Sequence, residues 1–398
     1  MQEHPLGTVS LTINNHQVVA AQGSTILEAA RIAGVDIPTL CHHPDLTNVG
    51  ACRMCVVSVE KARGLETACT TPVVEGMVVD TKSEEARETR RFVLEMLLSD
   101  HPNECMICEV NGDCELQDLA YEYNVTWPTH GHDEGHHVYD IDPDPNPFVF
   151  MDRNKCILCS RCIRACSEIQ VRDVWNFAHR GFNTKLVAGA DQFMLDARCE
   201  SCGQCVAYCP VGALYDKMSM GAGRVGQITK VRTVCSYCGV GCSFDLNVRN
   251  GKIVRVTSSE DAPVNGMALC VKGRYGYDYV HNPDRLTRPL VRAKWLGMER
   301  VDERVASGEW QVTAVAEKRI QLSSDGIDAI TPDTLIQTDW DSALDVVAHK
   351  FTEEKQTHGG EAFAVLASAK CTVEENFLFN KFTRQVLGTN SIDHCARL

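Results

Sequence analysis

The stretch Lys155–Pro210 contains two cysteine runs, CILCSRCIRAC at 156–166 and CESCGQCVAYC at 199–209. Both runs have the spacing C-x2-C-x2-C-x3-C. Pro210 follows the second run, whereas Ser167 follows the first. In the bacterial ferredoxin pattern, three cysteines of one run bind one [4Fe–4S] cluster and the fourth binds the other cluster. The spacing therefore predicts two [4Fe–4S] clusters whose fourth ligands are exchanged between the runs.

This exchange defines two predicted ligand sets. The first consists of Cys156, Cys159, Cys162 and Cys209, and the second of Cys199, Cys202, Cys205 and Cys166. Zinc sites and disulfides are the alternatives for so many cysteines. Zinc sites usually combine two C-x2-C pairs, and a triplet with a crossing fourth cysteine does not follow that pattern.

The composition favours metal binding over nucleic-acid or membrane binding. The 398 residues carry a formal net charge of −14, whereas nucleic-acid binding requires a basic surface. No run of 18 apolar residues predicts a membrane span, and the first residues lack the pattern of a secretory signal. The 21 cysteines, grouped in C-x2-C units, indicate metal binding in a reducing, cytoplasmic compartment. Because small cluster modules gain folding energy from their metal, iron removal should unfold most of the first two-thirds of the chain.

Residues 5–81 are predicted to form a small domain with a [2Fe–2S] cluster. Strands are expected at 9–13 and 17–20 around an Asn-Asn turn, followed by a helix at 25–33 capped by Ser24. The predicted cluster ligands are Cys41, Cys52, Cys55 and Cys69. His42 and His43 lie close to these cysteines, but four thiolates already suffice. We interpret both histidines as packing or surface residues rather than ligands.

Residues 82–140 are predicted to form a second cluster module. An amphipathic helix is expected over 83–99, with Phe92, Leu94, Leu97 and Leu98 on its apolar side. The predicted ligands after it are His101, Cys105, Cys108 and Cys114. A neutral imidazole can replace a thiolate in an iron–sulfur site. The alternative is a zinc site formed by the three cysteines beside a surface histidine. The histidine-rich stretch 131–137 is expected to be a solvated connection.

The two-cluster module is predicted to occupy residues 141–220, after a proline-rich linker. The glycine pattern of 221–226 does not follow a strand or precede a helix, so we interpret it as a linker rather than a dinucleotide site. Residues 228–290 are predicted to form a small domain with a hairpin around Asn250-Gly251. A fourth [4Fe–4S] cluster is predicted there, with the ligands Cys235, Cys238, Cys242 and Cys270.

Two parts of the sequence resemble known families. Residues 5–81 are similar to the N-terminal β-grasp domain of the large iron–sulfur subunit of NADH dehydrogenase. The strings CSYCGVGC at 235–242 and CVKGR at 270–274 resemble the first domain of bis-molybdopterin oxidoreductases, most closely the catalytic subunit of cytoplasmic formate dehydrogenases. In that family, a lysine two residues after the fourth cysteine lies between cluster and pterin. The resemblance therefore implies that Lys272 is an electron relay.

Residues 291–398 are predicted to be the start of an α/β domain. Helices are expected at 340–355 and 372–387, with a buried strand at 362–366 between them. The polar stretch 295–338 is interpreted as a surface insertion. Cys371 and Cys395 remain outside the ligand sets and are expected to be small buried apolar residues.

Together, the residues and the resemblance predict a multidomain α+β chain. The resemblance implies oxidation of formate to carbon dioxide at a molybdenum or tungsten bis-molybdopterin guanine dinucleotide centre. It also implies electron transfer through one [2Fe–2S] and four [4Fe–4S] clusters to a flavin-containing, NAD-reducing subunit of a hetero-oligomer. We expect the catalytic metal ligand directly beyond Leu398, encoded as cysteine or, by a UGA codon, as selenocysteine. The alternatives are an NADH dehydrogenase large subunit, an iron-only hydrogenase, and an electron-transfer subunit without its own active site.

Overall fold

A computed structural model describes residues 7–126, 137–312 and 330–394 of the chain. The chain divides into two compact units. The first contains residues up to 234 together with 242–277, and the second contains 235–241 together with the residues from 278 onwards. Among the described residues, no helix combines the length and the apolar character needed to cross a bilayer.

The first unit begins with a β-grasp sheet. Strands β1 (Thr8–Ile13) and β2 (His16–Ala21) form the predicted antiparallel hairpin, and Asn14 and Asn15 adopt φ values of 48° and 67° in its turn. Asparagine tolerates this left-handed conformation better than most residues. Strand β5 (Val78–Asp80) pairs parallel with β1. The sheet is completed by β3 (Val56–Val59) and β4 (Glu66–Thr67), in the order β2-β1-β5-β3-β4.

Helix α1 (Ile26–Ile32) covers this sheet and buries Ile26, Leu27, Ala29 and Ala30. The prediction that Ser24 caps this helix was wrong. Thr25 is the N-cap, since its hydroxyl accepts from the Glu28 N–H while the Glu28 carboxylate accepts from the Thr25 N–H. This reciprocal capping box satisfies two N–H groups at once, which Ser24 could not do from one residue earlier.

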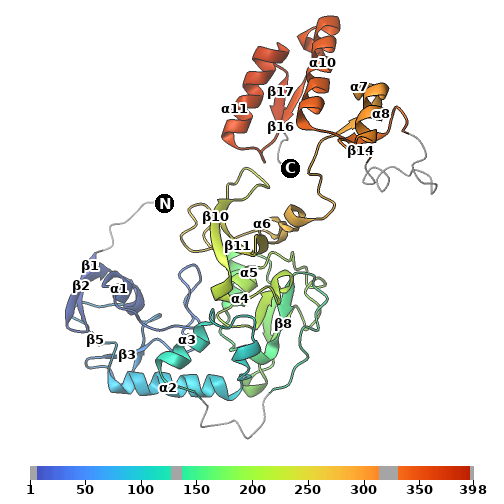
Figure 1. Cartoon of the computed structure of the whole chain (residues 1–398). Helices are drawn as coiled ribbons and strands as arrows, with labels where there is room; N and C mark the ends of the chain where they lie inside the picture. The colour runs from blue at the N-terminus through green and yellow to red at the C-terminus, as the bar shows by residue number, and fades with distance from the viewer. Residues whose placement is uncertain (1–6, 127–136, 313–329, 395–398) are drawn as a thin grey trace. The chain divides into compact units, whose positions relative to one another are not determined.

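Two helices follow the β-grasp sheet and lie beside each other (Figure 1). Helix α2 (Glu84–Ser99) is capped by Ser83, and helix α3 (Glu115–Glu122) begins directly after Cys114. Leu94 and Leu98 are buried as predicted, but Phe92 is 52% exposed, so its assignment to the apolar side was wrong. Arg90 is buried instead, because its guanidinium donates to the Val56 carbonyl and the Tyr123 hydroxyl.

The two cysteine runs fold into a pseudo-symmetric module. Strand β6 (Val149–Met151) pairs with β9 (Leu214–Asp216), and β7 (Trp175–Ala178) pairs with β8 (Lys185–Ala188). Each run contributes a short helix, α4 (Arg161–Arg164) or α5 (Gln204–Ala207). A π-helical turn, Ala165–Ile169, continues α4. The 3-10 turns of this part of the chain are η1 (Cys105–Ile107), η3 (Arg153–Lys155), η5 (Gly181–Asn183), η6 (Lys217–Ser219) and η7 (Val225–Gln227).

The first unit ends with a three-stranded meander. It consists of β10 (Thr229–Val234), β11 (Ser243–Arg249) and β12 (Lys252–Thr257), paired antiparallel in that order. Asn250 and Gly251 form the predicted turn with positive φ values. Helix α6 (Val271–Tyr275) follows, with Cys270 at its N-cap position.

The second unit has a packed core where a surface insertion was expected. Strands β13 (Leu290–Arg292), β15 (Leu335–Gln337) and β14 (Gln311–Val312) form a sheet, accompanied by α7 (Ala293–Leu296) and α8 (Met298–Ala306). Trp310 is 1% exposed, and its indole N–H donates to Asp339 at 3.0 Å. The insertion interpretation was therefore wrong for the described part of 295–338, because a few large apolar side chains suffice to form this core.

The remaining elements of the second unit form a β–α–β unit. Helix α10 (Trp340–His358) precedes β16 (Val365–Ala367), which pairs parallel with β17 (Ile392–His394). Between them lie α11 (Val373–Phe382) and a π-helical turn, Thr383–Leu387, ended by Gly388 at φ 81°. The 3-10 turns η8 (Asp278–His281) and η9 (Gly360–Ala362) complete this unit. The predicted α/β start is confirmed, but the strand is not buried, since Leu366 is 84% exposed.

Candidate iron–sulfur sites

The first cysteine run meets the last cysteine of the second run at one cavity. Cys156, Cys159, Cys162 and Cys209 all line this cavity, together with apolar residues such as Ile157 and Val211. The predicted exchange of fourth cysteines therefore corresponds to the side chains that the fold brings together here.

Local backbone geometry explains why the thiols of each run converge. Leu158 and Ser160 of the first run have φ values of 53° and 59°, and the equivalent residues Ser201 and Gly203 of the second run have 54° and 74°. Left-handed residues between successive cysteines turn the chain around a common centre. Both runs repeat this pattern, so the cysteine spacing encodes the same wrapped loop twice.

The cysteines of the second predicted set, which are Cys199, Cys202, Cys205 and Cys166, also lie close to one another. Burial raises the pKa of the Cys205 thiol, and the neighbouring thiols of Cys202, Cys199 and Cys166 raise it further. Backbone N–H groups also approach the sulfur atoms of this set, because Val174 donates to Cys166 Sγ at 3.4 Å and Ser201 donates to Cys199 Sγ at 3.3 Å. Hydrogen bonds to sulfur are one of the means by which proteins adjust the potential of a cluster.

The electrostatics of the cavity around the first set suit a metal cluster better than free thiols. Burial raises the pKa of Cys156 and of Cys159 to about 12, so without a metal both thiols would stay neutral. Iron would supply the positive charge that keeps such buried thiolates deprotonated. Within the described ranges, no three His, Cys, Asp or Glu side chains converge as ligands of a single ion. The thiolates of a [4Fe–4S] cluster bind different iron atoms and therefore lie farther apart.

The four cysteines of the β-grasp domain also gather. Cys55 Sγ lies 3.3 Å from Cys69 Sγ, and the Cys52 N–H donates to Cys41 Sγ at 3.5 Å. Hydrogen bonds from the thiols of Cys52 and Cys69 lower the pKa of Cys41. Gly50 at φ 59° allows the backbone to turn immediately before these residues.

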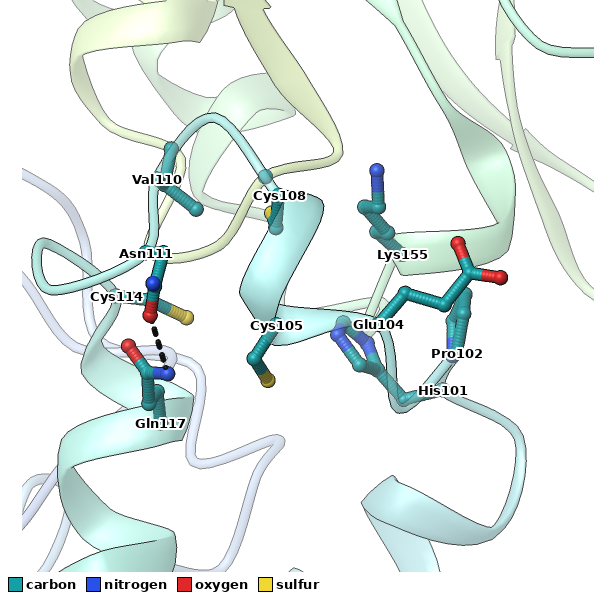
Figure 2. Close-up of a pocket in the computed structure, with 11 residues that line it drawn as sticks. His101, Pro102, Glu104, Cys105, Cys108, Val110, Asn111, Cys114, Gln117 and Lys155 are labelled. Carbon is teal, nitrogen blue, oxygen red and sulfur yellow. Dashed lines mark hydrogen bonds between the residues drawn. The ribbon is translucent and has the colours of Figure 1, made fainter. Parts of the chain in front are cut away.

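His101 faces a pocket with the three cysteines that follow it. Figure 2 shows His101, Cys105, Cys108 and Cys114 around this pocket, which Lys155 and Gly212 also line. Burial lowers the pKa of His101 to about 4, so its imidazole is neutral at pH 7. Its Nδ1 atom is buried without a hydrogen-bond partner among the described residues. A neutral imidazole beside three thiols is a donor set that fits iron.

His42 and His43 are both buried and make contacts outside the four cysteines. His43 is 4% exposed, lies edge-on to Tyr208 at 4.5 Å, and its Nε2 is 3.2 Å from Glu260. His42 Nδ1 lies 3.4 Å from the guanidinium of Arg31.

The residues of the fourth predicted set belong to both units of the chain. Cys242 directly precedes β11 and Cys270 precedes α6, whereas Cys235 and Cys238 lie in the segment assigned to the second unit. Lys272 is in the first turn of α6, and it is exposed. Cys371 is partly exposed, so its prediction as a buried residue was wrong, and Cys395 lies outside the described residues.

Sequence reasoning missed the buried arginines around these sites. Arg161, beside Cys162, donates to both carboxylate oxygens of Glu115 at 2.7 and 2.8 Å, and Glu115 directly follows Cys114. Arg164 and Arg274 are also buried. Each of these arginines lies within a few residues of a predicted ligand cysteine, and this spacing could have indicated them. Their hydrogen bonds, however, join parts of the chain that are distant in sequence.

Five family models match the chain in succession. The first three are described as "2Fe-2S iron-sulfur cluster binding domain" (7–84), "NADH-ubiquinone oxidoreductase-G iron-sulfur binding region" (90–128) and "NADH-quinone oxidoreductase subunit 3, ferredoxin-like domain" (146–215). The last two are described as "Molybdopterin oxidoreductase Fe4S4 domain" (228–282) and "Molybdopterin oxidoreductase" (285–398). The chain is therefore a multidomain α+β protein with iron–sulfur modules of the NADH-quinone oxidoreductase type, followed by the start of a molybdopterin oxidoreductase domain.

Curated relatives carry names of several related oxidoreductases. The NADPH-Fe(3+) oxidoreductase subunit alpha of Geobacter sulfurreducens is 33% identical, over 98% of this chain and 40% of its own length. A subunit of an NADH-quinone oxidoreductase of Rhizobium meliloti is 32% identical, over 98% of this chain and 40% of its own length. A "Putative formate dehydrogenase" of Staphylococcus aureus is 28% identical, over 100% of this chain and 39% of its own length. The chain spans about 40% of the length of these relatives.

Proposed function

We propose that this chain is the electron-transferring part of a formate dehydrogenase catalytic subunit. It would hold one [2Fe–2S] cluster and four [4Fe–4S] clusters in the predicted ligand sets. The observation that carries the electron-transfer part of this proposal is the cavity that Cys156, Cys159 and Cys162 share with Cys209, because the two-cluster ferredoxin pattern requires this crossing.

The other sets support the same interpretation. The His101 pocket offers three thiols and a neutral imidazole, and the β-grasp domain offers four close cysteines. Together with the order of the matching modules, these sites suggest a series of electron carriers in one chain.

The molybdopterin modules support a catalytic centre at one end of this series. A molybdenum or tungsten bis-pterin centre, when bound, supplies the two-electron oxidation of formate to carbon dioxide. Within this chain, the amino group of Lys272 would bind the pterin next to the fourth ligand set. Arg274 of the same helix is buried, so α6 carries one cation that is exposed and another that is enclosed by the protein.

We propose that the electron acceptor is a flavin-containing, NAD-reducing subunit of a hetero-oligomer in the cytoplasm. The matches of residues 7–128 to iron–sulfur modules, and the names of the NADPH- and NADH-linked relatives, support this choice. The acceptor would meet the chain on the side of the [2Fe–2S] and His101 sites.

A second candidate is a subunit of an NADH-quinone oxidoreductase or a related reductase, without formate oxidation. The 32% and 33% identical relatives favour this candidate as strongly as the formate dehydrogenase relative favours the first. The ferredoxin-like model of NADH-quinone oxidoreductases matches residues 146–215, which include both cysteine runs, so this match is compatible with both candidates.

Metal analysis and a formate assay on the protein purified from its native source distinguish the two candidates. We expect molybdenum or tungsten in the preparation, bleaching of the cluster absorbance by formate, and slower bleaching in a Lys272→Met variant. Lys252→Met, which removes an exposed lysine from the same module, is the matched control and should behave as wild type. A preparation that NADH or NADPH reduces, but that contains neither metal and ignores formate, would favour the second candidate.

A further inference from the structure

Arg164 connects two ligand sets through backbone carbonyl oxygens. Its Nη2 atom donates to the carbonyl oxygen of Cys41 at 2.5 Å and to that of Cys159 at 3.3 Å. Cys41 belongs to the [2Fe–2S] set, and Cys159 belongs to the first [4Fe–4S] set. A further bond from Nη1 to the carbonyl oxygen of Thr47, at 2.6 Å, fixes the guanidinium in this position.

Arg274 connects two other sets through its side chain and its place in α6. Its backbone N–H makes the first helical bond of α6, to the carbonyl oxygen of Cys270 at 3.0 Å, and its side-chain Nε donates to the carbonyl oxygen of Cys202 at 3.0 Å. Cys270 belongs to the fourth set and Cys202 to the second. The Gln204 side-chain oxygen accepts from Arg274 Nη2 at 2.9 Å and from the Leu269 N–H at 3.3 Å, which adds a further link between the two loops.

The loop of the second cysteine run is shaped to receive Arg274. Gly203 has a φ of 74°, and a Cβ atom on it would lie 2.3 Å from Arg274 Cδ and 2.5 Å from Tyr275 Oη. Tyr275 itself stacks on Phe148 at 4.6 Å. Only glycine leaves space at this position for the guanidinium to reach the Cys202 carbonyl.

Both guanidiniums are buried cations with no carboxylate partner among the ion pairs of the described residues. Arg164 is 6% exposed and Arg274 is 3% exposed, whereas the buried Arg161 pairs with Glu115. Burying a charge without a partner is costly. Carbonyl oxygens offset only part of this cost, so the surroundings favour an additional negative charge. A cluster with its thiolates supplies such a charge.

We propose that Arg164 and Arg274 are positioning residues for electron transfer, each fixing the ligand loops of two adjacent clusters and stabilising their reduced states. The inference rests on the ligand sets proposed above. Reduction adds one negative charge to a cluster, and a nearby fixed cation favours that state. The guanidinium itself stays charged throughout the pH range in which the protein is folded.

The [2Fe–2S] cluster allows the cleanest test, because its paramagnetic resonance signal persists at temperatures at which [4Fe–4S] signals broaden. The full chain, purified without oxygen, is titrated electrochemically as wild type and as Arg164→Gln. At the wild-type midpoint potential, we expect the ratio of reduced to oxidised [2Fe–2S] cluster to fall about tenfold in the variant. For a one-electron couple, this change corresponds to about 59 mV.

Three further variants separate electrostatics from folding. Arg164→Lys retains the charge and should titrate within about threefold of wild type. Arg274→Gln should leave the [2Fe–2S] titration unchanged and shift a [4Fe–4S] signal. Arg63→Gln removes an exposed arginine of the β-grasp domain, whose charge is screened by solvent, so it should shift neither signal.

Defined outcomes would overturn the proposal. The proposal is contradicted if Arg164→Gln and Arg274→Gln both retain their clusters and both titrate like Arg63→Gln. If Arg164→Gln loses its [2Fe–2S] cluster, the two remaining variants test the proposal. A tenfold shift of the [2Fe–2S] titration in Arg164→Lys would contradict it. An unshifted [4Fe–4S] titration in Arg274→Gln would also contradict it. Absence of cluster signals from the wild-type chain would instead refute the proposed function.

Discussion

Cys156 and Cys209 line the same cavity, although they belong to different cysteine runs. The strand pair β6–β9 brackets both runs, because β6 ends shortly before Cys156 and β9 begins shortly after Cys209. This pairing brings the end of the second run back to the start of the first. The crossing therefore follows from the strand topology as well as from the cysteine spacing.

Replacing Cys209 should remove the cluster of the first run. In Cys209→Ser, we expect a loss of about one to four iron atoms per chain and the disappearance or conversion of one [4Fe–4S] signal, because a cubane with three thiolates readily loses iron. Iron analysis and low-temperature paramagnetic resonance measure both effects. Cys371→Ser, which changes a cysteine outside every ligand set, is the matched control and should retain all iron. Equal iron contents in the two variants would contradict the assignment.

Replacing His101 should change the potential of its cluster without removing it. His101→Cys keeps four donors in the pocket but adds a thiolate, which makes the cluster more negative and lowers its potential. A redox titration should therefore show the corresponding signal reduced at lower potential, with unchanged iron content. His16, on the exposed start of β2, provides the control variant His16→Cys. An unshifted titration would mean that His101 is not a ligand.

Gly203 should tolerate alanine much less than Gly221 does. Both glycines have φ near 70°, so alanine costs each about 1–2 kcal/mol in the left-handed conformation. At Gly203, the new methyl group also collides with Arg274 and Tyr275, which adds about 1–3 kcal/mol of overpacking. Nothing lies within 4 Å of the corresponding position at Gly221. The denaturation midpoint in urea should fall more in Gly203→Ala; equal decreases would refute this packing.

Asp216 should make the first unit less stable as pH rises from about 4 to about 6. Burial raises its pKa to about 6, so the folded state keeps a proton that the unfolded chain releases near pH 4. The stabilising proton is fully present below about pH 4 and is lost as pH rises through about 6. Asp216→Asn should flatten this slope and increase stability at pH 7 by about 1–3 kcal/mol.

The control for the pH effect is Asp191→Asn. Asp191 is exposed, and its hydrogen bond with Lys185 lowers its pKa, so its small contribution has the opposite sign. Urea unfolding between about pH 4 and pH 7.5, followed by circular dichroism, measures both variants. A wild-type slope that persists unchanged in Asp216→Asn would show that another group causes it.

The sequence predicted the features that short-range geometry encodes. Such features depend on neighbouring positions; they are the cysteine spacing, the Asn14-Asn15 and Asn250-Gly251 turns, and the α/β order of the last residues. The structure contains these turns and this order. The fold class was therefore predictable. The cap of α1 was missed because both Ser24 and Thr25 are good caps, and only the reciprocal bond with Glu28 selects Thr25.

Features that depend on long-range contacts were not predictable. The polar composition around Trp310 led to the prediction of a surface insertion, whereas residues of 291–312 and 335–343 pack together into a core. Likewise, Arg164 reaches Cys41 across more than a hundred residues, and nothing in its local sequence indicates that contact. Phe92 and Leu366 are exposed despite their apolar side chains, because helical or strand position alone does not decide which face is covered.

The central claim is that this chain holds five iron–sulfur clusters, and quantitative iron and sulfide analysis with paramagnetic resonance tests it most directly. For the full chain purified without oxygen, we predict about 18 iron atoms per chain, one [2Fe–2S] signal and several [4Fe–4S] signals after reduction. Removing the iron should also abolish most of the native circular dichroism spectrum. Zinc in place of iron, or an iron content of only a few atoms with a native-like spectrum, would contradict the claim.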